Sequence, residues 1–229
     1  MKQITLKVKD IRKSIAESLG SIMVEDGFEY KKTTNEFICK KNNCTYIYNL
    51  LLTSWSTSYW LDVRLWIRQE QIENVYESIL GKSHGLTLSQ HMLERIFYSP
   101  DGRQNGKGNS LTISMVSDDD IFPAIEGLKN YYLEIAKPYF GRFITLEAFD
   151  NFINSPPFEY SPAYVGTNTN ERCMKGLITA KLVNSSNYNN LITIYDELIK
   201  KTLSDVQPDS VMNYNKVKEY LAHNKVFSL

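Results

Sequence analysis

The alternation of apolar and polar side chains is clearest between Cys44 and Arg68, in the stretch CTYIYNLLLTSWSTSYWLDVRLWIR. This stretch predicts two long antiparallel strands joined by a short Ser/Thr turn. The second strand alternates strictly, with apolar side chains on one face at Leu61, Val63, Leu65 and Ile67. Its other face carries Trp60, Asp62, Arg64, Trp66 and Arg68. Because successive side chains of a strand point to opposite faces, we expect the apolar face in the core and the Trp/Arg face nearest to any functional surface.

A helix and two shorter strands precede this hairpin. Apolar residues recur at spacings of three and four up to Met23, which predicts a helix from about Asp10. The stretch 28–41 then has the alternation of two short strands. Asn42 and Asn43 follow as a two-residue turn, because asparagine tolerates a positive φ. The first third of the chain is therefore predicted to be a helix followed by a four-stranded antiparallel meander.

After Arg68 the pattern predicts mostly helices. A fifth strand is expected at 111–115, after a loop-like stretch at 100–110 that is rich in glycine and polar residues. Apolar residues at helical spacing predict helices over 72–80, 92–97, 121–135, 145–152, 170–183, 188–203 and 210–222. Gly81 is expected to end the first of these helices, since glycine favours the left-handed cap position.

Together these elements predict an α+β fold with an N-terminal helix, an antiparallel sheet of four to five strands and a mostly helical C-terminal half. We place a sheet-bearing part at 1–117 and a helical part, packed against it, at 118–229. One continuous domain is the alternative. The 229 residues suffice for either arrangement, and a chain of this size buries roughly 70% of its unfolded surface.

Composition narrows the functional classes. The chain has 26 Lys and Arg residues and 26 Asp and Glu residues, so no overall field attracts nucleic acid, which argues against nucleic-acid binding. The N-terminal sequence lacks the apolar segment of a signal peptide, and no run approaches the roughly 18 apolar residues that span a membrane. Three cysteines in such a chain favour a reducing compartment. We therefore expect a cytoplasmic protein that does not enter a membrane.

No motif marks a catalytic, metal or cofactor site. The glycines around Lys107 depart from the phosphate-loop spacing and precede a strand, not a helix. Neither a nucleophile elbow nor a zinc-like cluster of cysteines and histidines is present. We therefore predict no catalytic residues, no metal and no cofactor, and expect binding in preference to catalysis.

Aromatic and arginine side chains form the candidate binding surface. Interfaces between proteins are enriched in Trp, Tyr and Arg, and arginine stacks on indole rings by cation–π contact. We predict that a protein partner contacts Tyr46, Tyr48, Trp55, Trp60, Arg64, Trp66 and Arg68. The alternative is structural: a helix would cover this face as well, and Asp62 would pair with Arg64 or Arg68.

Two segments resemble a known kind of protein. The helix followed by GFEYKKTTNEFICKK, and the strand that leads into DVRLWIRQEQIENVYE, are similar to small bacterial cytosolic proteins that include immunity proteins of polymorphic toxin systems. The segment KGLITAKLVNSSNYNNLITIYDELIKK resembles the closing helical hairpin of the same proteins. The resemblance implies a non-catalytic binder that blocks a toxin. It transfers no functional residues.

Two other functions stay open. A small-molecule-binding protein or an enzyme would need a pocket between the sheet and the C-terminal helices, lined by Tyr160, Tyr164 and Arg172. Single-stranded nucleic acid could stack on the Trp/Tyr face, but the balanced charge argues against it.

Overall fold

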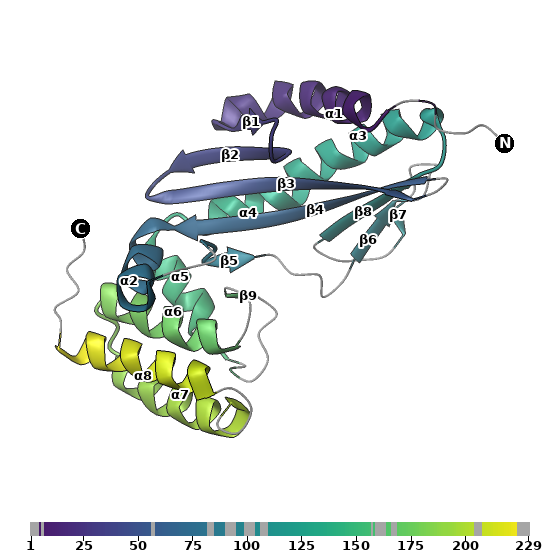
Figure 1. Cartoon of the computed structure of the whole chain (residues 1–229). Coiled ribbons are helices and arrows are strands. Elements are labelled where there is room, and N and C mark those ends of the chain that lie inside the picture. The colour runs from purple at the N-terminus through teal and green to yellow at the C-terminus, as the bar shows by residue number, and fades with distance from the viewer. Residues whose placement is uncertain are drawn as a thin grey trace. The chain divides into compact units, whose positions relative to one another are not determined.

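The structure is a computed structural model of the whole chain (Figure 1). It describes residues 5, 7–55, 58–81, 85–89, 95–98, 104–105, 110–156, 158, 164–165, 169–203 and 208–223. These residues form an N-terminal helix, an antiparallel sheet and a mostly helical C-terminal half, which confirms the predicted α+β class. Among the described helices, none combines the length and the apolar composition needed to cross a membrane.

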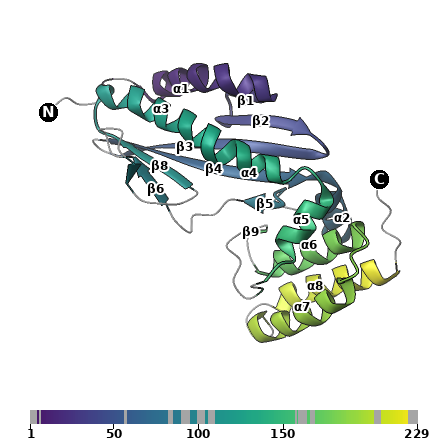
Figure 2. The ribbon, with the colours of Figure 1, turned by 180° about the vertical axis from the view of Figure 1, so that it is seen from behind.

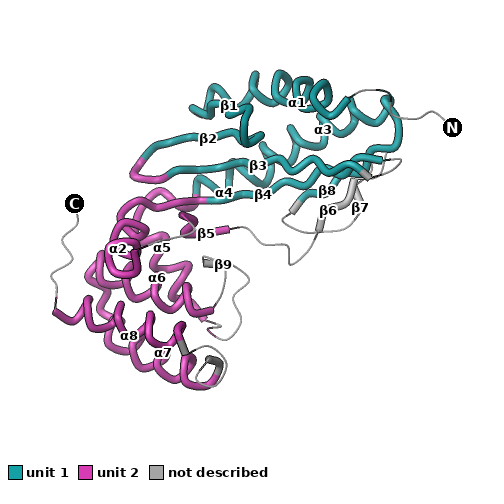
Figure 3. The backbone as a smooth tube through the Cα atoms, in the orientation of Figure 1, with its two compact units in different colours: residues 1–41, 45–66, 90–141 teal, residues 42–44, 67–89, 142–229 magenta. Residues whose placement is uncertain are grey.

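The chain forms two compact units, drawn in teal and magenta in Figure 3. Unit 1 comprises residues 1–41, 45–66 and 90–141, and unit 2 comprises residues 42–44, 67–89 and 142–229. Both units are discontinuous along the chain, because β3 (Cys44–Trp55) and β4 (Ser58–Gln69) each give residues to both. The sequence analysis placed one boundary after residue 117, whereas the compact units assign residues 118–141 to the sheet-bearing unit.

The main sheet follows the order β1-β2-β3-β4-β8-β6-β7. Besides β3 and β4, its strands are β1 (Glu29–Lys31), β2 (Glu36–Lys41), β6 (Arg95–Tyr98), β7 (Gln104–Asn105) and β8 (Ser110–Met115). The pairs β1–β2, β4–β8 and β6–β7 are antiparallel, and β6–β8 is parallel. The turn between β2 and β3 has positive φ at Asn42 and Asn43 (54° and 55°), as the sequence predicted.

The predicted helix over 92–97 is wrong where the structure describes it. Residues 95–98 form β6, in which Ile96 pairs with Leu111 and Phe97 with Thr112 of β8. Pairing with a distant strand has outweighed the local helical spacing, as is common for short apolar runs. The first residues of this prediction, 92–94, lie outside the described residues.

Helices cover one face of the sheet in unit 1. These are α1 (Val8–Met23), α3 (Ile121–Tyr131), a π-helical turn (Tyr132–Ala136) and α4 (Lys137–Arg142). Figure 2 shows α3 and α4 running along β3 and β4. Their aromatic rings pack edge-on or tilted against those of β3, with ring centroids 5.5 Å apart for Tyr46 and Phe140 and 6.0 Å apart for Tyr48 and Tyr132. Such aromatic pairs stabilise beyond their buried area.

A charged contact joins the end of α1 to the π-helical turn and α4. The Asp26 carboxylate accepts a hydrogen bond from the Tyr132 hydroxyl at 2.6 Å. It also forms an ion pair with Lys137 Nζ at 2.9 Å. Burial by itself raises the pKa of Asp26, but these two partners outweigh it, so that the pKa lies below its ordinary value of 3.8.

Replacing Asp26 by asparagine should therefore change how stability depends on pH. A carboxyl whose pKa is lowered by folding stabilises the protein above its unfolded pKa, and this contribution is lost as the pH falls through the folded pKa. We expect Asp26→Asn to cost about 1 kcal/mol at about pH 7 and much less at about pH 3. Urea unfolding at both pH values measures this. An equal cost at both would mean that the carboxylate charge contributes nothing.

Unit 2 is built around one helix. Its elements are α2 (Glu70–Leu80), α5 (Leu146–Ile153), α6 (Thr169–Leu182), α7 (Tyr188–Leu203) and α8 (Pro208–His223), with the short antiparallel pair β5 (Leu88–Ser89) and β9 (Tyr164–Val165). Helix α6 contacts all four other helices, and its residues 170–180 are buried (Figure 1). The helices predicted over 72–80, 145–152, 170–183, 188–203 and 210–222 are confirmed.

Candidate functional site

The two faces of β4 differ in solvent exposure as predicted. Leu61 and Leu65 are fully buried. On the opposite face Trp60 is 36% exposed, Arg64 is exposed and Trp66 is half-buried. Figures 1 and 2 show that the described helices of unit 1 lie over the buried face, so β4 presents its Trp/Arg face outward in this unit.

The two tyrosines predicted for this surface lie on the other face. Tyr46 and Tyr48 are buried, and the Tyr48 hydroxyl donates a hydrogen bond to the carbonyl of Leu128 at 3.3 Å. Both therefore belong to the core under α3 and α4 and are unavailable to a partner in this structure. The alternation along β3 decides this, because its even-numbered residues from Tyr46 to Leu52 are all buried.

Other side chains of β3 share the outward face. The odd-numbered residues from 45 to 53 are half-buried or exposed, among them Ile47 and Leu51. Since β3 and β4 are neighbours in the sheet, these side chains continue the surface of β4. We name the set Ile47, Leu51, Trp60, Arg64 and Trp66 the outer β-surface.

Among the charged side chains of this surface, Arg64 is available to a partner. Asp62 accepts a hydrogen bond from the Thr112 hydroxyl of β8 at 2.5 Å, across the Asp62–Thr112 register position. Among the described residues, no ion pair joins Asp62 to Arg64, as the structural alternative would require. Within the described part of the chain, the Arg64 guanidinium has no hydrogen bond or ion pair.

The remaining predicted residues of this surface do not join it. Arg68 belongs to unit 2, where Nε pairs with Glu70 and Nη1 with Glu77, both at 2.9 Å. Its guanidinium therefore fixes the start of α2 on the end of β4. Trp55 lies at the end of β3, but its side chain is outside the described residues.

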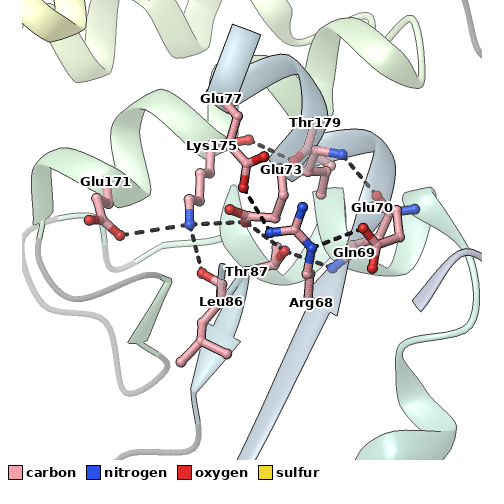
Figure 4. A network of polar contacts seen from close by, with 11 residues as sticks. Arg68, Gln69, Glu70, Glu73, Glu77, Leu86, Thr87, Glu171, Lys175 and Thr179 are labelled. Carbon is pink, nitrogen blue, oxygen red and sulfur yellow. Dashed lines mark hydrogen bonds and ion pairs between the residues drawn. The ribbon is translucent and has the colours of Figure 1, made fainter. Parts of the chain in front are cut away.

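A second polar site, inside unit 2, was not foreseen from the sequence (Figure 4). The Lys175 ammonium on α6 and the Glu73 carboxylate on α2 are completely buried and form an ion pair at 2.9 Å. Lys175 Nζ also donates to the carbonyl of Leu86 at 2.6 Å and lies 3.7 Å from the Glu171 carboxylate. The ring of Tyr76 faces the ammonium, with 5.0 Å between Nζ and the ring centroid.

Further hydrogen bonds extend this network to the end of β4. The Thr87 hydroxyl donates to Glu73 at 2.7 Å and accepts from the backbone N–H of Gln69 at 2.8 Å. The Gln69 side chain in turn caps α2 by accepting from the N–H of Ile72 at 2.9 Å. Lys175 is thus held by oxygens from three segments, and its role in this geometry is to join α2, α6 and residues 86–87.

Of the alternative pocket residues, only Arg172 has a described side chain. It is buried, and its three nitrogens donate to carbonyls of Ile153, Ser155 and Phe158 at 3.0, 2.8 and 2.9 Å. Arg172 therefore closes the C-terminal end of α5, where helix carbonyls lack partners. Tyr160 lies outside the described residues, and of Tyr164 only the backbone, in β9, is described.

The described residues provide little for metal or nucleophile chemistry. No group of three or more His, Cys, Asp and Glu side chains among them could hold a metal ion. Cys39, Cys44 and Cys173 are buried and form no disulfide. Burial raises the pKa of the Cys173 thiol to about 12, so this thiol carries almost no reactive thiolate at neutral pH.

No family model, no curated protein and no solved structure matches the chain. Its function is therefore argued from its own residues.

Proposed function

We propose that this chain is a non-catalytic protein-binding module whose outer β-surface contacts a protein partner. The observation that carries the proposal is the exposure of Trp60 and Arg64 on a strand whose opposite face is buried core. Trp and Arg dominate the energetics of protein interfaces. At Trp60, β4 is paired on both sides, by β3 and β8, so this part of the surface is held on a regular backbone, which lowers the entropic cost of binding.

We further propose that the partner is a protein toxin and that the chain acts as a bacterial, cytoplasmic immunity protein. The resemblance of its helix, strand and hairpin segments to such proteins supports this. Its three buried cysteines form no disulfide, which suits a reducing compartment. The equal numbers of acidic and basic residues, 26 each, favour a toxin other than a basic nuclease, because inhibitors of basic nucleases gain association rate from a strong negative field.

The Arg64→Glu variant tests the surface. Arg64 is exposed and lacks a described partner, so we expect the free energy of unfolding to change by less than about 0.5 kcal/mol. Binding should weaken by about tenfold or more, because the guanidinium is replaced by a charge of opposite sign at the centre of the contact. Thermal unfolding and capture of the partner by the tagged protein measure the two effects.

A matched control makes the same change of charge at a residue outside the outer β-surface. Lys216 is exposed on α8, in unit 2, and Lys216→Glu changes the net charge by the same amount as Arg64→Glu. The control should retain a stoichiometric partner as well as the unchanged protein does. Equal loss in both variants would mean that net charge, and not the outer β-surface, governs binding.

A further inference from the structure

An open cavity lies between the first half of α1 and the edge strand β1. Its volume is about 730 Å³, within the range of roughly 300 to 1,000 Å³ that is usual for small-molecule sites. All of its described lining belongs to unit 1 and comes from residues 8–17 of α1 and residues 30–32. It is separate from the residues that define the outer β-surface.

The cavity has an apolar wall with a fixed ring. Val8 and Ala16 contribute aliphatic carbons from α1, and Tyr30 contributes its ring from β1. The Tyr30 ring packs on Phe37 with 4.9 Å between centroids, and its hydroxyl donates to Asn35 Oδ1 at 2.8 Å. The tyrosine is therefore held from two sides, and this wall is formed before any ligand arrives.

Positive charge surrounds this wall. Arg12, Lys9, Lys13 and Lys32 line the cavity. The lining also includes two carboxylates, of which Glu17 lies 3.8 Å from Lys13 Nζ in an exposed pair. Basic groups thus outnumber acidic ones in a protein whose total charge is balanced, and the cavity favours an anion.

Arg12 is the arginine among the described lining residues. Its Nε is closed to solvent and makes no hydrogen bond among the described residues. A ligand in the open cavity would therefore meet the guanidinium through its Nη groups. Burial raises the pKa of Tyr30, and the charge of Arg12 opposes that rise.

We propose that this cavity binds a small amphipathic anion, with a carboxylate or sulfonate head on Arg12 and an apolar body against Val8, Ala16 and Tyr30. Guanidinium groups bind such heads through paired, charge-assisted hydrogen bonds. The start of α1 adds the positive end of a helix dipole on the same side. This ligand site is independent of the protein-binding surface proposed for β4.

Titration of the full chain with 8-anilinonaphthalene-1-sulfonate, followed by fluorescence, tests the proposal. We expect one saturable site from which decanoate displaces the dye. Arg12→Gln should lower the affinity for the dye by about tenfold or more, because one charge-assisted contact is lost. The same variant should lower the affinity for the uncharged dye N-phenyl-1-naphthylamine far less, because that dye lacks the anionic head.

Two further variants locate the dye. Ala16→Phe places a large ring at the apolar wall, at a position of α1, and should block the binding of both dyes. Arg142→Gln removes an exposed arginine that lies over the Phe143 and Phe152 rings in unit 2, and should leave both unchanged. Circular dichroism confirms that each variant is folded. The proposal is overturned if the dye shows no saturable binding, if Arg12→Gln and Ala16→Phe bind it normally, or if Arg64→Gln abolishes binding instead.

Discussion

Replacing Lys175 by methionine is expected to lower the free energy of unfolding by about 3 to 5 kcal/mol, because it leaves the buried Glu73 carboxylate without its cation. Both side chains are completely buried, and the ion pair between them is 2.9 Å long. Methionine fits the space of the lysine stem, so the cost arises from the unpaired charge and not from a cavity. Urea unfolding of the two proteins at neutral pH measures the difference.

The double variant Lys175→Met with Glu73→Leu separates these causes. Replacing both members of a buried ion pair by apolar residues is often nearly neutral, so most of the lost stability should return. Recovery should be incomplete, because the hydroxyl of Thr87 loses its acceptor on Glu73. If Lys175→Met alone costs less than about 1 kcal/mol, the ammonium is not the buried partner of Glu73 that the structure contains.

The Gly176→Ala variant should also destabilise strongly, by about 2 to 3 kcal/mol, because a methyl group at this point of α6 has no space. A Cβ on Gly176 would lie 2.5 Å from Asn154 Oδ1 and 2.8 Å from the Tyr195 hydroxyl oxygen. These two atoms are themselves hydrogen-bonded to each other at 2.5 Å, and Asn154 Nδ2 donates to the Gly176 carbonyl at 3.0 Å. The added methyl group must therefore displace the side chains of both Asn154 and Tyr195.

Gly20→Ala provides the matched control in another helix. Gly20 lies within α1, and a Cβ at this position would have no atom within 4 Å. Alanine is the better helix former, so this variant should be more stable by about 0.5 to 1 kcal/mol. Thermal or urea unfolding of both variants gives opposite signs if the close approach at Gly176 is correct. Stabilisation of both would contradict it.

The sequence was sufficient where one local pattern decided the structure. The strict alternation of β4 correctly separated Leu61 and Leu65 from Trp60 and Arg64. In the same way, Asn42 and Asn43 predicted their own turn, because few other residues adopt a positive φ at low cost. In these cases the side-chain period or the backbone preference of single residues determines the result.

The sequence was misleading on β3 because both of its faces contain apolar residues. Tyr46 and Tyr48 suggested an aromatic surface, but they lie in the core. Polar residues could have indicated the true faces: Thr45, Asn49 and Thr53 share the parity opposite to the tyrosines, and none of them is buried. The positions of the polar residues therefore indicated the exposed face of β3 better than the positions of the aromatic residues did.

The buried network of unit 2 could not be predicted from local pattern. Helix α6 has many polar residues, and polar helices are expected on the surface. Lys175 is buried only because Glu73 and the carbonyl of Leu86, both far away in the sequence, supply its partners. Such burial depends on pairing between charges that are far apart in the sequence. The spacing of residues along one helix does not predict that pairing.

Site-specific photo-crosslinking, in the complex with the protein that the unchanged chain retains, tests whether the outer β-surface contacts the partner. The photoreactive residue p-benzoylphenylalanine replaces Trp60 in one variant and Phe122, which is 71% exposed on α3, in the other. Both sites are exposed aromatic positions of unit 1, so they differ in location and not in chemistry. The account predicts a covalent adduct with the partner from position 60 and none from position 122. An adduct from position 122 without one from position 60 would contradict it.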